Sequence, residues 1–212
     1  MNLNQFIDHT LLSANATTKE IKKCCVEAID HKFYAVCVNS SRVKNAKEIL
    51  KGSNVKLAAT IGFPLGASST TSKIREAETA ITHGADEIDM VINIGFLKDG
   101  KSDLVKAEIE KIKIAIGDKI LKVIIETCYL SEYEIKLASN LVMQAGADFL
   151  KTSTGFGSRG ASLNDVKIMK EVVGEQVKIK ASGGIRDAET ANEFIALGVD
   201  RIGTSSGIKI VA

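Results

Sequence analysis

Two lysines lie near the ends of predicted strands, where an amine could do chemistry. Lys151 is in the run Phe-Leu-Lys-Thr-Ser-Thr-Gly at 149–155, and Lys180 is in Val-Lys-Ile-Lys-Ala-Ser-Gly-Gly at 177–184. Burial and a neighbouring cation both lower the pKa of a lysine, and the neutral amine then attacks a carbonyl to form a Schiff base. The pair predicts that Lys151 is a covalent nucleophile and that Lys180 is the cation that activates it.

Two carboxylates on other predicted strands accompany these lysines. Asp89 lies in Glu-Ile-Asp-Met-Val at 87–91, and Asp8 lies in Ile-Asp-His-Thr at 7–10. A buried carboxylate needs a cation or hydrogen-bond donors, which the two lysines would supply. We expect Asp89 to transfer protons during carbinolamine formation and carbon–carbon cleavage. For Asp8, a purely structural role at a strand end is an equally good interpretation.

Glycine-rich turns follow the last two predicted strands, at 182–186 and 203–207. Glycine lets the backbone approach an anion, and barrels often bind phosphate in these two loops. The turns predict a phosphorylated small-molecule substrate, bound by residues there and after Lys151: Thr154, Gly155, Gly183, Gly184, Gly203, Ser205 and Ser206. Arg159 is a candidate for added charge. Thr10 and Cys37 are candidate pocket residues, although a buried structural thiol is the more common role for cysteine.

The chain has 212 residues, 28 basic and 26 acidic side chains, and a formal net charge of +2. This length suits one domain, expected over residues 1–212, that buries a sizeable core. The balanced charge gives no indication of nucleic acid as a partner. No run reaches the roughly 18 apolar residues of a membrane span, and the first ten residues lack the core of a signal peptide, so we expect a cytoplasmic protein. The cysteines lack the C-x-x-C spacing of metal sites, so we expect reduced thiols, no metal and no cofactor.

Short runs rich in β-branched residues alternate with longer amphipathic stretches. Strands are predicted at 6–11, 33–38, 57–61, 87–92, 122–126, 149–153, 177–181 and 201–203. Helices are predicted near 18–30, 41–50, 70–82, 102–116, 131–145, 162–173 and 187–197. Regular alternation of strand and helix is typical of a parallel sheet. We therefore predict a (β/α)8 barrel whose last helix is short or missing.

A repeated turn refines this prediction. Gly84, Gly146 and Gly198 each stand between a helix and the fourth, sixth or eighth strand, and Asp89, Lys151 and Gly203 follow them by five residues. Alternate strands of a barrel supply the same interior layer. We therefore expect the Asp89 carboxylate, the Lys151 amine and the space left by the missing side chain of Gly203 to lie at the same height in the barrel interior. Lys178, on the face of Lys180, is expected at the exposed lower rim, and Glu126 in the cavity without an assigned role.

An open doubly wound sheet would show the same alternation of strands and helices. Eight units without a G-x-G-x-x-G run after the first strand favour the closed barrel. From these residues alone, a lysine-dependent aldolase and a sugar-phosphate isomerase both remain open, and the two paired lysines favour the aldolase. A non-catalytic sugar-phosphate binder is a third interpretation, which leaves the chemistry-bearing residues without a purpose.

Five motifs in order resemble deoxyribose-phosphate aldolases over nearly the whole chain. They are Ile-Asp-His-Thr at 7–10, Ile-Gly-Phe-Pro-Leu-Gly at 61–66, Glu-Ile-Asp-Met-Val at 87–91, Phe-Leu-Lys-Thr-Ser-Thr-Gly at 149–155 and Lys-Ala-Ser-Gly-Gly-Ile-Arg at 180–186. The resemblance implies reversible, metal-independent cleavage of 2-deoxy-D-ribose 5-phosphate to acetaldehyde and D-glyceraldehyde 3-phosphate, in deoxyribonucleoside catabolism. It also implies a homodimer or homotetramer.

The resemblance assigns a role to each matching residue. Lys151 is the implied Schiff-base lysine, Lys180 its electrostatic partner, Asp89 the proton-transfer group and Asp8 an aid in positioning Lys180. The phosphate is expected on Gly183, Gly184, Ser205 and Ser206. This chain departs from some members in having Phe156 where they carry a phosphate-binding lysine, with Arg159 as a possible substitute, and in ending without a tail that terminates in tyrosine.

Overall fold

A computed structural model describes residues 3–212, which form a closed barrel of eight parallel strands paired in chain order. The strands are β1 Ile7–Leu11, β2 Ala35–Asn39, β3 Lys56–Ile61, β4 Glu87–Val91, β5 Ile120–Ile124, β6 Phe149–Lys151, β7 Lys178–Ser182 and β8 Arg201–Thr204. Pairing of β1 with β8 closes the sheet. This confirms the predicted barrel and excludes the open sheet.

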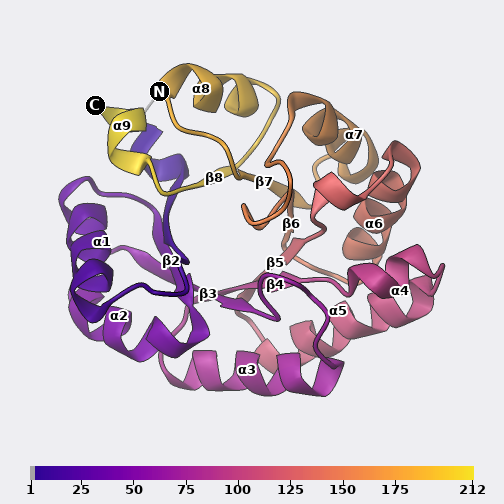
Figure 1. Ribbon diagram of the computed structural model, residues 1–212, viewed down its shortest axis with the longest axis horizontal. Helices are drawn as coiled ribbons and strands as arrows, with labels where there is room; N and C mark the ends of the chain where they lie inside the picture. Colours follow the sequence, from indigo (N-terminus) through magenta and orange to yellow (C-terminus); the bar gives the residue numbers. More distant parts are fainter. Residues whose placement is uncertain (1–2) are drawn as a thin grey trace.

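Helices surround the strands (Figure 1). They are α1 Thr18–Asp30, α2 Val43–Leu50, α3 Thr70–Thr82, α4 Ile94–Lys98, α5 Ser102–Ile116, α6 Glu132–Gln144, α7 Leu163–Val173, α8 Ala188–Ala196 and α9 Gly207–Val211, with 3-10 turns at Leu3–Phe6, Ser40–Arg42 and Thr127–Tyr129. The predicted helix positions are confirmed to within two residues at each end. The short last helix is α9, whereas α4 was not predicted.

Local sequence signals explain where these helices start and stop. Thr17 and Glu20 form a capping box at α1, and Ser131 and Glu134 form one at α6, so orphan backbone N–H groups at both helix starts are satisfied. Gly84, Gly146 and Gly198, which follow α3, α6 and α8, have φ of 104°, 73° and 86°. Only glycine adopts this left-handed conformation at low cost, so the predicted C-terminal stops are confirmed.

Apolar side chains fill the space between the strands and the helices, whereas the barrel interior is partly ionic. Ile88, Leu121 and Ile179 are fully buried in the main apolar cluster. Their neighbours along the strands, Asp89, Lys122 and Lys180, are also fully buried. Because successive strand residues point to opposite faces, these charged side chains point into the barrel. The interior usually consists of stacked branched apolar residues, so this departure marks a site.

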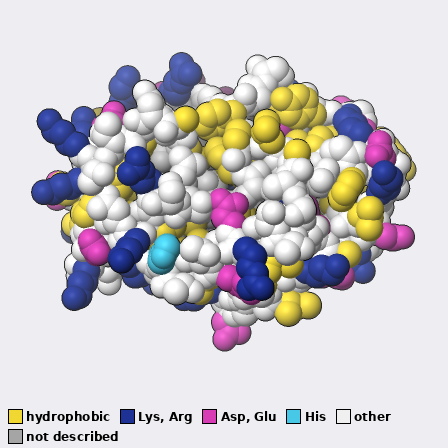
Figure 2. Space-filling view, turned by 60° about the horizontal axis from the view of Figure 1, so that its bottom comes forward, with side chains coloured by type: hydrophobic (Ala, Val, Ile, Leu, Met, Phe, Trp, Pro, Cys, Tyr) yellow, Lys and Arg dark blue, Asp and Glu magenta, His cyan; other side chains and the backbone are white. Residues whose placement is uncertain are grey.

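Charges on the outer surface have a different distribution. On the face shown in Figure 2, most basic side chains lie at the end where α1 and α2 lie, and acidic side chains are scattered over the whole face. Within residues 3–212, none of the helices is long and apolar enough to cross a membrane.

Candidate active site

Lys151 is the last residue of β6, and its side chain is 3% exposed. It lines a cavity of about 260 Å³ at the C-terminal ends of the strands. Its Nζ donates a hydrogen bond of 2.7 Å to Oδ2 of Asp89 on β4. The amine is therefore both accessible from the cavity and held by a buried carboxylate.

Asp89 is the centre of a buried cluster of charges. Besides Lys151, it accepts hydrogen bonds from Lys122 of β5 at 2.8 Å and from Lys180 of β7 at 2.8 Å. Lys180 also donates to Asp8 of β1. The cluster thus joins side chains from five strands, β1, β4, β5, β6 and β7.

A second group of charges lies beneath the first. Asp8 also accepts a hydrogen bond from Arg201 of β8, whose guanidinium lies 3.5 Å from the centre of the Tyr34 ring. Glu87 of β4 lies 2.5 Å from Lys122 Nζ and 3.5 Å from Arg201. These contacts supply the partners that buried charges require.

The balance of charge singles out Lys151. Among the described residues of this cluster, Lys122, Lys151, Lys180 and Arg201 face Asp8, Glu87 and Asp89, which leaves one excess positive charge when all are ionised. Lys122 and Lys180 each pair closely with two carboxylates. Lys151 pairs with Asp89 alone within residues 3–212. Loss of the proton from Lys151 therefore balances the cluster at the lowest electrostatic cost.

The pKa shifts agree with this ranking. Burial and the charge of Lys180 lower the pKa of Lys151 below its usual value, against the opposing effect of Asp89. Burial also disfavours the charged form of Lys180, but Asp8 and Asp89 outweigh it and raise the pKa of Lys180. Burial alone would raise the pKa of Asp89, yet Lys122, Lys151 and Lys180 hold it well below its usual range. Lys151 is thus the amine that loses its proton most easily.

Gly203 on β8 provides the gap that the repeated turns predicted. A Cβ atom there would lie 3.0 Å from Cε of Lys180 and 2.9 Å from Cβ of Ser182. The missing side chain leaves room for the Lys180 stem to cross the barrel interior. Asp89, Lys151 and Gly203 therefore supply the carboxylate, amine and gap around one interior.

The glycine-rich turns form the upper wall of the cavity. Predicted residues that line it are Thr10, Lys151, Thr154, Gly155, Gly183, Gly184, Gly203 and Ser205. Gly183 packs so closely on Gly160 that a Cβ on Gly160 would lie 2.1 Å from the Gly183 oxygen. The glycines therefore bring the loops after β6 and β7 into backbone contact.

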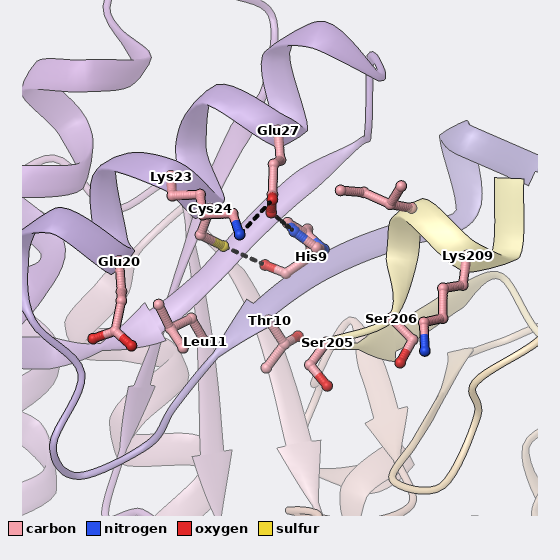
Figure 3. A pocket seen from close by; sticks show the side chains of 11 residues that line it. His9, Thr10, Leu11, Glu20, Lys23, Cys24, Glu27, Ser205, Ser206 and Lys209 are labelled. Atoms are coloured by element: carbon pink, nitrogen blue, oxygen red, sulfur yellow. Dashed lines mark hydrogen bonds and ion pairs between the residues drawn. The ribbon is translucent and has the colours of Figure 1, made fainter. Parts of the chain in front are cut away.

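Two of the residues predicted to bind the phosphate or to line the pocket lie outside this cavity. Ser206 borders an adjacent groove of about 550 Å³ between α1 and α9, together with His9 and Lys209 (Figure 3). Its N–H donates to Thr204 Oγ1 at 2.9 Å as the chain turns into α9, whereas Ser205 lines both spaces. Cys37 is fully buried near the charged cluster, with Sγ 3.9 Å from Asp89 Oδ2. Cys37 is not among the residues that line the cavity, and its buried thiol agrees with the more common structural role.

Arg159 does not supply charge to the cavity. Its guanidinium donates to Asp165 and, at 3.2 Å, to the Thr127 carbonyl. Arg159 is held by these bonds and is not among the residues that line the cavity. Lys178 is exposed at the lower rim, as expected, with Nζ 5.8 Å from the centre of the Phe149 ring. Phe156 lines the cavity and meets Phe63 edge to face, with the ring centres 5.4 Å apart.

Four residues of the site were missed from the sequence. Lys122, Glu87 and Arg201 belong to the charged cluster, and Arg186 lines the cavity in the loop after β7. Each had a signal. Lys122, Glu87 and Arg201 are charged residues at the start of predicted strands, and Arg186 ends a glycine-rich turn.

Comparisons with known proteins agree with this geometry. A family model described as DeoC/LacD family aldolase matches residues 3–211. The deoxyribose-phosphate aldolase of Thermococcus gammatolerans is 56% identical over 216 residues, which cover 100% of this chain and 96% of the relative. That of Finegoldia magna is 54% identical over 211 residues, which cover 100% and 99%.

Solved structures share the barrel. QR15, an aldolase, superposes with a TM-score of 0.95 at 44% identity, covering 99% of this chain and 94% of that one. A tetrameric deoxyribose phosphate aldolase from Aeropyrum pernix gives a TM-score of 0.91 at 31% identity, covering 99% and 89%. The chain belongs to the DeoC/LacD family of aldolases.

Proposed function

We propose that this aldolase cleaves 2-deoxy-D-ribose 5-phosphate reversibly into acetaldehyde and D-glyceraldehyde 3-phosphate through a Schiff base on Lys151. The observation that carries the proposal is the amine of Lys151 in the cavity, 2.7 Å from a carboxylate that also binds Lys122 and Lys180. The similarity of the chain to two deoxyribose-phosphate aldolases supports the choice of substrate.

The first step is the addition of the neutral Lys151 amine to C1 of the open-chain sugar. The resulting carbinolamine loses water to give an iminium ion. Asp89 binds Lys151 in the resting enzyme and then faces the positive charge of the iminium ion. Because the carboxylate is already in place, its orientation adds no reorganisation cost as the iminium forms.

The second step breaks the bond between C2 and C3. A base removes the proton of the C3 hydroxyl, the C2–C3 electron pair moves toward the iminium, and C3 becomes the aldehyde of glyceraldehyde 3-phosphate. The enamine left on Lys151 is protonated at C2 and hydrolysed, which releases acetaldehyde and the free amine. Asp89, kept ionised by the lysines around it, is the proposed proton-transfer group, and Asp8 holds Lys180 in position.

The phosphate occupies the glycine-rich end of the cavity in this proposal. Gly183, Gly184 and Ser205 line that end, and Gly155 extends it from the β6 loop. Arg186 takes the place of Arg159 as the cation, because it lines the cavity whereas Arg159 is bound by Asp165. A guanidinium binds phosphate well because its donors match two anionic oxygens.

A coupled assay for glyceraldehyde 3-phosphate, with 2-deoxy-D-ribose 5-phosphate as substrate, tests the proposal. We expect turnover by the wild-type protein and none by Lys151→Met, which removes the amine and keeps a similar apolar stem. Turnover by Lys151→Met would overturn the Schiff base. Interconversion of sugar phosphates without aldehyde release would instead indicate an isomerase, and tight binding without turnover a sugar-phosphate binder.

The proposal also covers the oligomeric state and the cellular location of the protein. We propose a homodimer or homotetramer, which the tetrameric Aeropyrum pernix structure supports. Ile114 on α5 and Tyr133 on α6 are 79% and 74% exposed, as expected for side chains that a second copy covers. Light scattering after gel filtration should give the mass of two or four chains. The free cysteines fit a cytoplasmic location.

A further inference from the structure

Glu126, which follows β5, has a carboxylate that the chemistry above does not use. The residue is 2% exposed, so its carboxylate is not a surface group. Its φ is 54°, in the left-handed region that residues other than glycine rarely adopt. An unfavourable backbone conformation persists where the surrounding contacts compensate for it, and such positions cluster at functional sites.

The contacts that compensate are made with Thr154, in the loop after Lys151. The Thr154 N–H lies 3.2 Å from each carboxylate oxygen of Glu126, and its hydroxyl donates to the same carboxylate. The hydroxyl oxygen in turn accepts the N–H of Phe156 at 3.0 Å. One hydroxyl has one hydrogen, so this arrangement requires Glu126 to act as the acceptor.

Other anchors hold different parts of this loop. On the β7 side, the Ser182 hydroxyl donates to the Ser153 carbonyl at 2.6 Å. Further along, Arg159 is bound by Asp165. Glu126 acts from the β5 side on the intervening residues, and these residues, Thr154 to Phe156, line the cavity. The carboxylate therefore orders the part of the loop that faces the substrate.

We infer that Glu126 is a positioning residue of the reaction. Its carboxylate fixes Thr154, and through it the backbone at Phe156, so that this wall stands opposite Gly183 and Gly184 and closes on the phosphorylated end of the substrate. The inference rests on the proposed function. It assigns Glu126 no contact with the reacting carbons, so its effect falls on KM for the phosphorylated substrate.

Four variants separate this role from a general contribution to folding. Glu126→Gln keeps the shape but removes the negative charge and puts an NH2 donor in place of one of the two oxygens that face the Thr154 N–H. Glu126→Gly removes the carboxylate and tolerates the left-handed backbone. Thr154→Val removes the hydroxyl, and Thr154→Ser retains it. Lys32→Gly is the matched control, because Lys32 is the other described residue besides glycine with positive φ, 52°, and is exposed outside the cavity.

The test combines steady-state kinetics with thermal unfolding. The kinetics are measured with 2-deoxy-D-ribose 5-phosphate and with unphosphorylated 2-deoxy-D-ribose. We expect Glu126→Gln, Glu126→Gly and Thr154→Val each to raise KM for the phosphorylated sugar about tenfold, as loss of one or two buried hydrogen bonds implies. We expect kcat, and kcat/KM for the unphosphorylated sugar, to change less than about threefold. Thr154→Ser, which keeps the hydroxyl, should raise KM less than Thr154→Val, and Lys32→Gly should resemble the wild type.

The double variant Glu126→Gln with Thr154→Val decides whether the two residues act together. Its effect should be no larger than that of the more severe single variant, because both break the same contact. Additive effects, or Glu126 variants that lose only thermal stability and keep the wild-type KM, would overturn the inference. An inactive wild-type protein would instead overturn the proposed function, so the two failures are distinguishable.

Discussion

Replacing Lys180 by methionine should move the pH dependence of the reaction to higher pH. Lys180 and Lys151 bind the same Asp89 oxygen at 2.8 and 2.7 Å, so their nitrogens lie within about 5.5 Å of each other. At that separation and an effective dielectric constant of about 20, two positive charges repel by about 3 kcal/mol, or about two pKa units. Without this repulsion Lys151 binds its proton more tightly.

The loss of Lys180 also strengthens the hold of Asp89 on the Lys151 ammonium, which acts in the same direction. The carboxylates keep other partners, since Asp8 remains bound to Arg201 and Asp89 to Lys122. We therefore expect a folded enzyme whose rate below the midpoint pH falls up to about a hundredfold and recovers at alkaline pH.

The assay is the initial rate of 2-deoxy-D-ribose 5-phosphate cleavage across a pH series, repeated for trapping of acetaldehyde by borohydride. Trapping reports Schiff-base formation without carbon–carbon cleavage. Lys178→Met is the control, because it removes the same charge from the exposed lower end of the same strand. A Lys180→Met enzyme with the wild-type midpoint and a normal rate would refute the assignment of Lys180 as the activating cation.

Three further predictions concern phosphate binding by Arg186, the space beside Gly203 and the stability of the fold in acid. Arg186→Gln should raise KM for the phosphorylated sugar by about tenfold or more, since a hydrogen bond to a charged group contributes about 1.5–3 kcal/mol. KM for unphosphorylated 2-deoxyribose should change little. Equal effects on both sugars would count against a role of Arg186 in phosphate binding. Gly203→Ala should lower the free energy of unfolding in urea by about 1–3 kcal/mol and reduce kcat, because its Cβ would meet Lys180 Cε at 3.0 Å. The control Gly95→Ala in α4 should change neither quantity. A wild-type kcat in Gly203→Ala would contradict the packing argument. Burial would raise the pKa values of Asp8 and Asp89, but Arg201, Lys180 and Lys122 around Asp8 and the lysines around Asp89 hold both pKa values below the usual range of an aspartate. A carboxyl group whose pKa is lower in the folded than in the unfolded protein stabilises the fold at pH values above its unfolded-state pKa, and this stabilisation is lost as the pH falls through its folded-state pKa. The free energy of unfolding should therefore be steady above about pH 5 and fall below about pH 4. Constant stability down to about pH 2 would contradict this prediction.

The fold was predictable because local signals and their repetition agree. β-branched runs, amphipathic stretches and glycine stops marked the strands and helices. The spacing of Gly84, Gly146 and Gly198 placed Asp89, Lys151 and Gly203 on alternate strands. The five-residue helix α4 was missed because its Ile-Gly-Phe-Leu-Lys segment is too short to show a helical period.

The site was only partly predictable because the height of a residue in a barrel depends on strand tilt. Lys122 and Lys178 both pair with Phe149 in the strand register, yet Lys122 is fully buried beside Asp89 and Lys178 is exposed. Residues paired across tilted strands lie at successively different heights along the barrel axis. The exposed position of Lys178 was predicted, but the place of Lys122 at the start of its predicted strand gave no sign that its side chain lies in the interior.

Charged side chains near the cavity raised a different difficulty. Arg159 and Arg186 follow glycine-rich turns in the same way, but Arg159 is bound by Asp165 at the start of α7 whereas Arg186 lines the cavity. That difference depends on contacts between a loop and a helix, which a single sequence does not encode in any local pattern.

Borohydride trapping of the wild-type protein with acetaldehyde, followed by peptide mass spectrometry, tests the central claim most directly. The account predicts one ethyl group on Lys151, dependent on borohydride and absent from Lys122 and Lys180. Modification of another lysine, or no adduct in a protein that still cleaves 2-deoxy-D-ribose 5-phosphate, would contradict it.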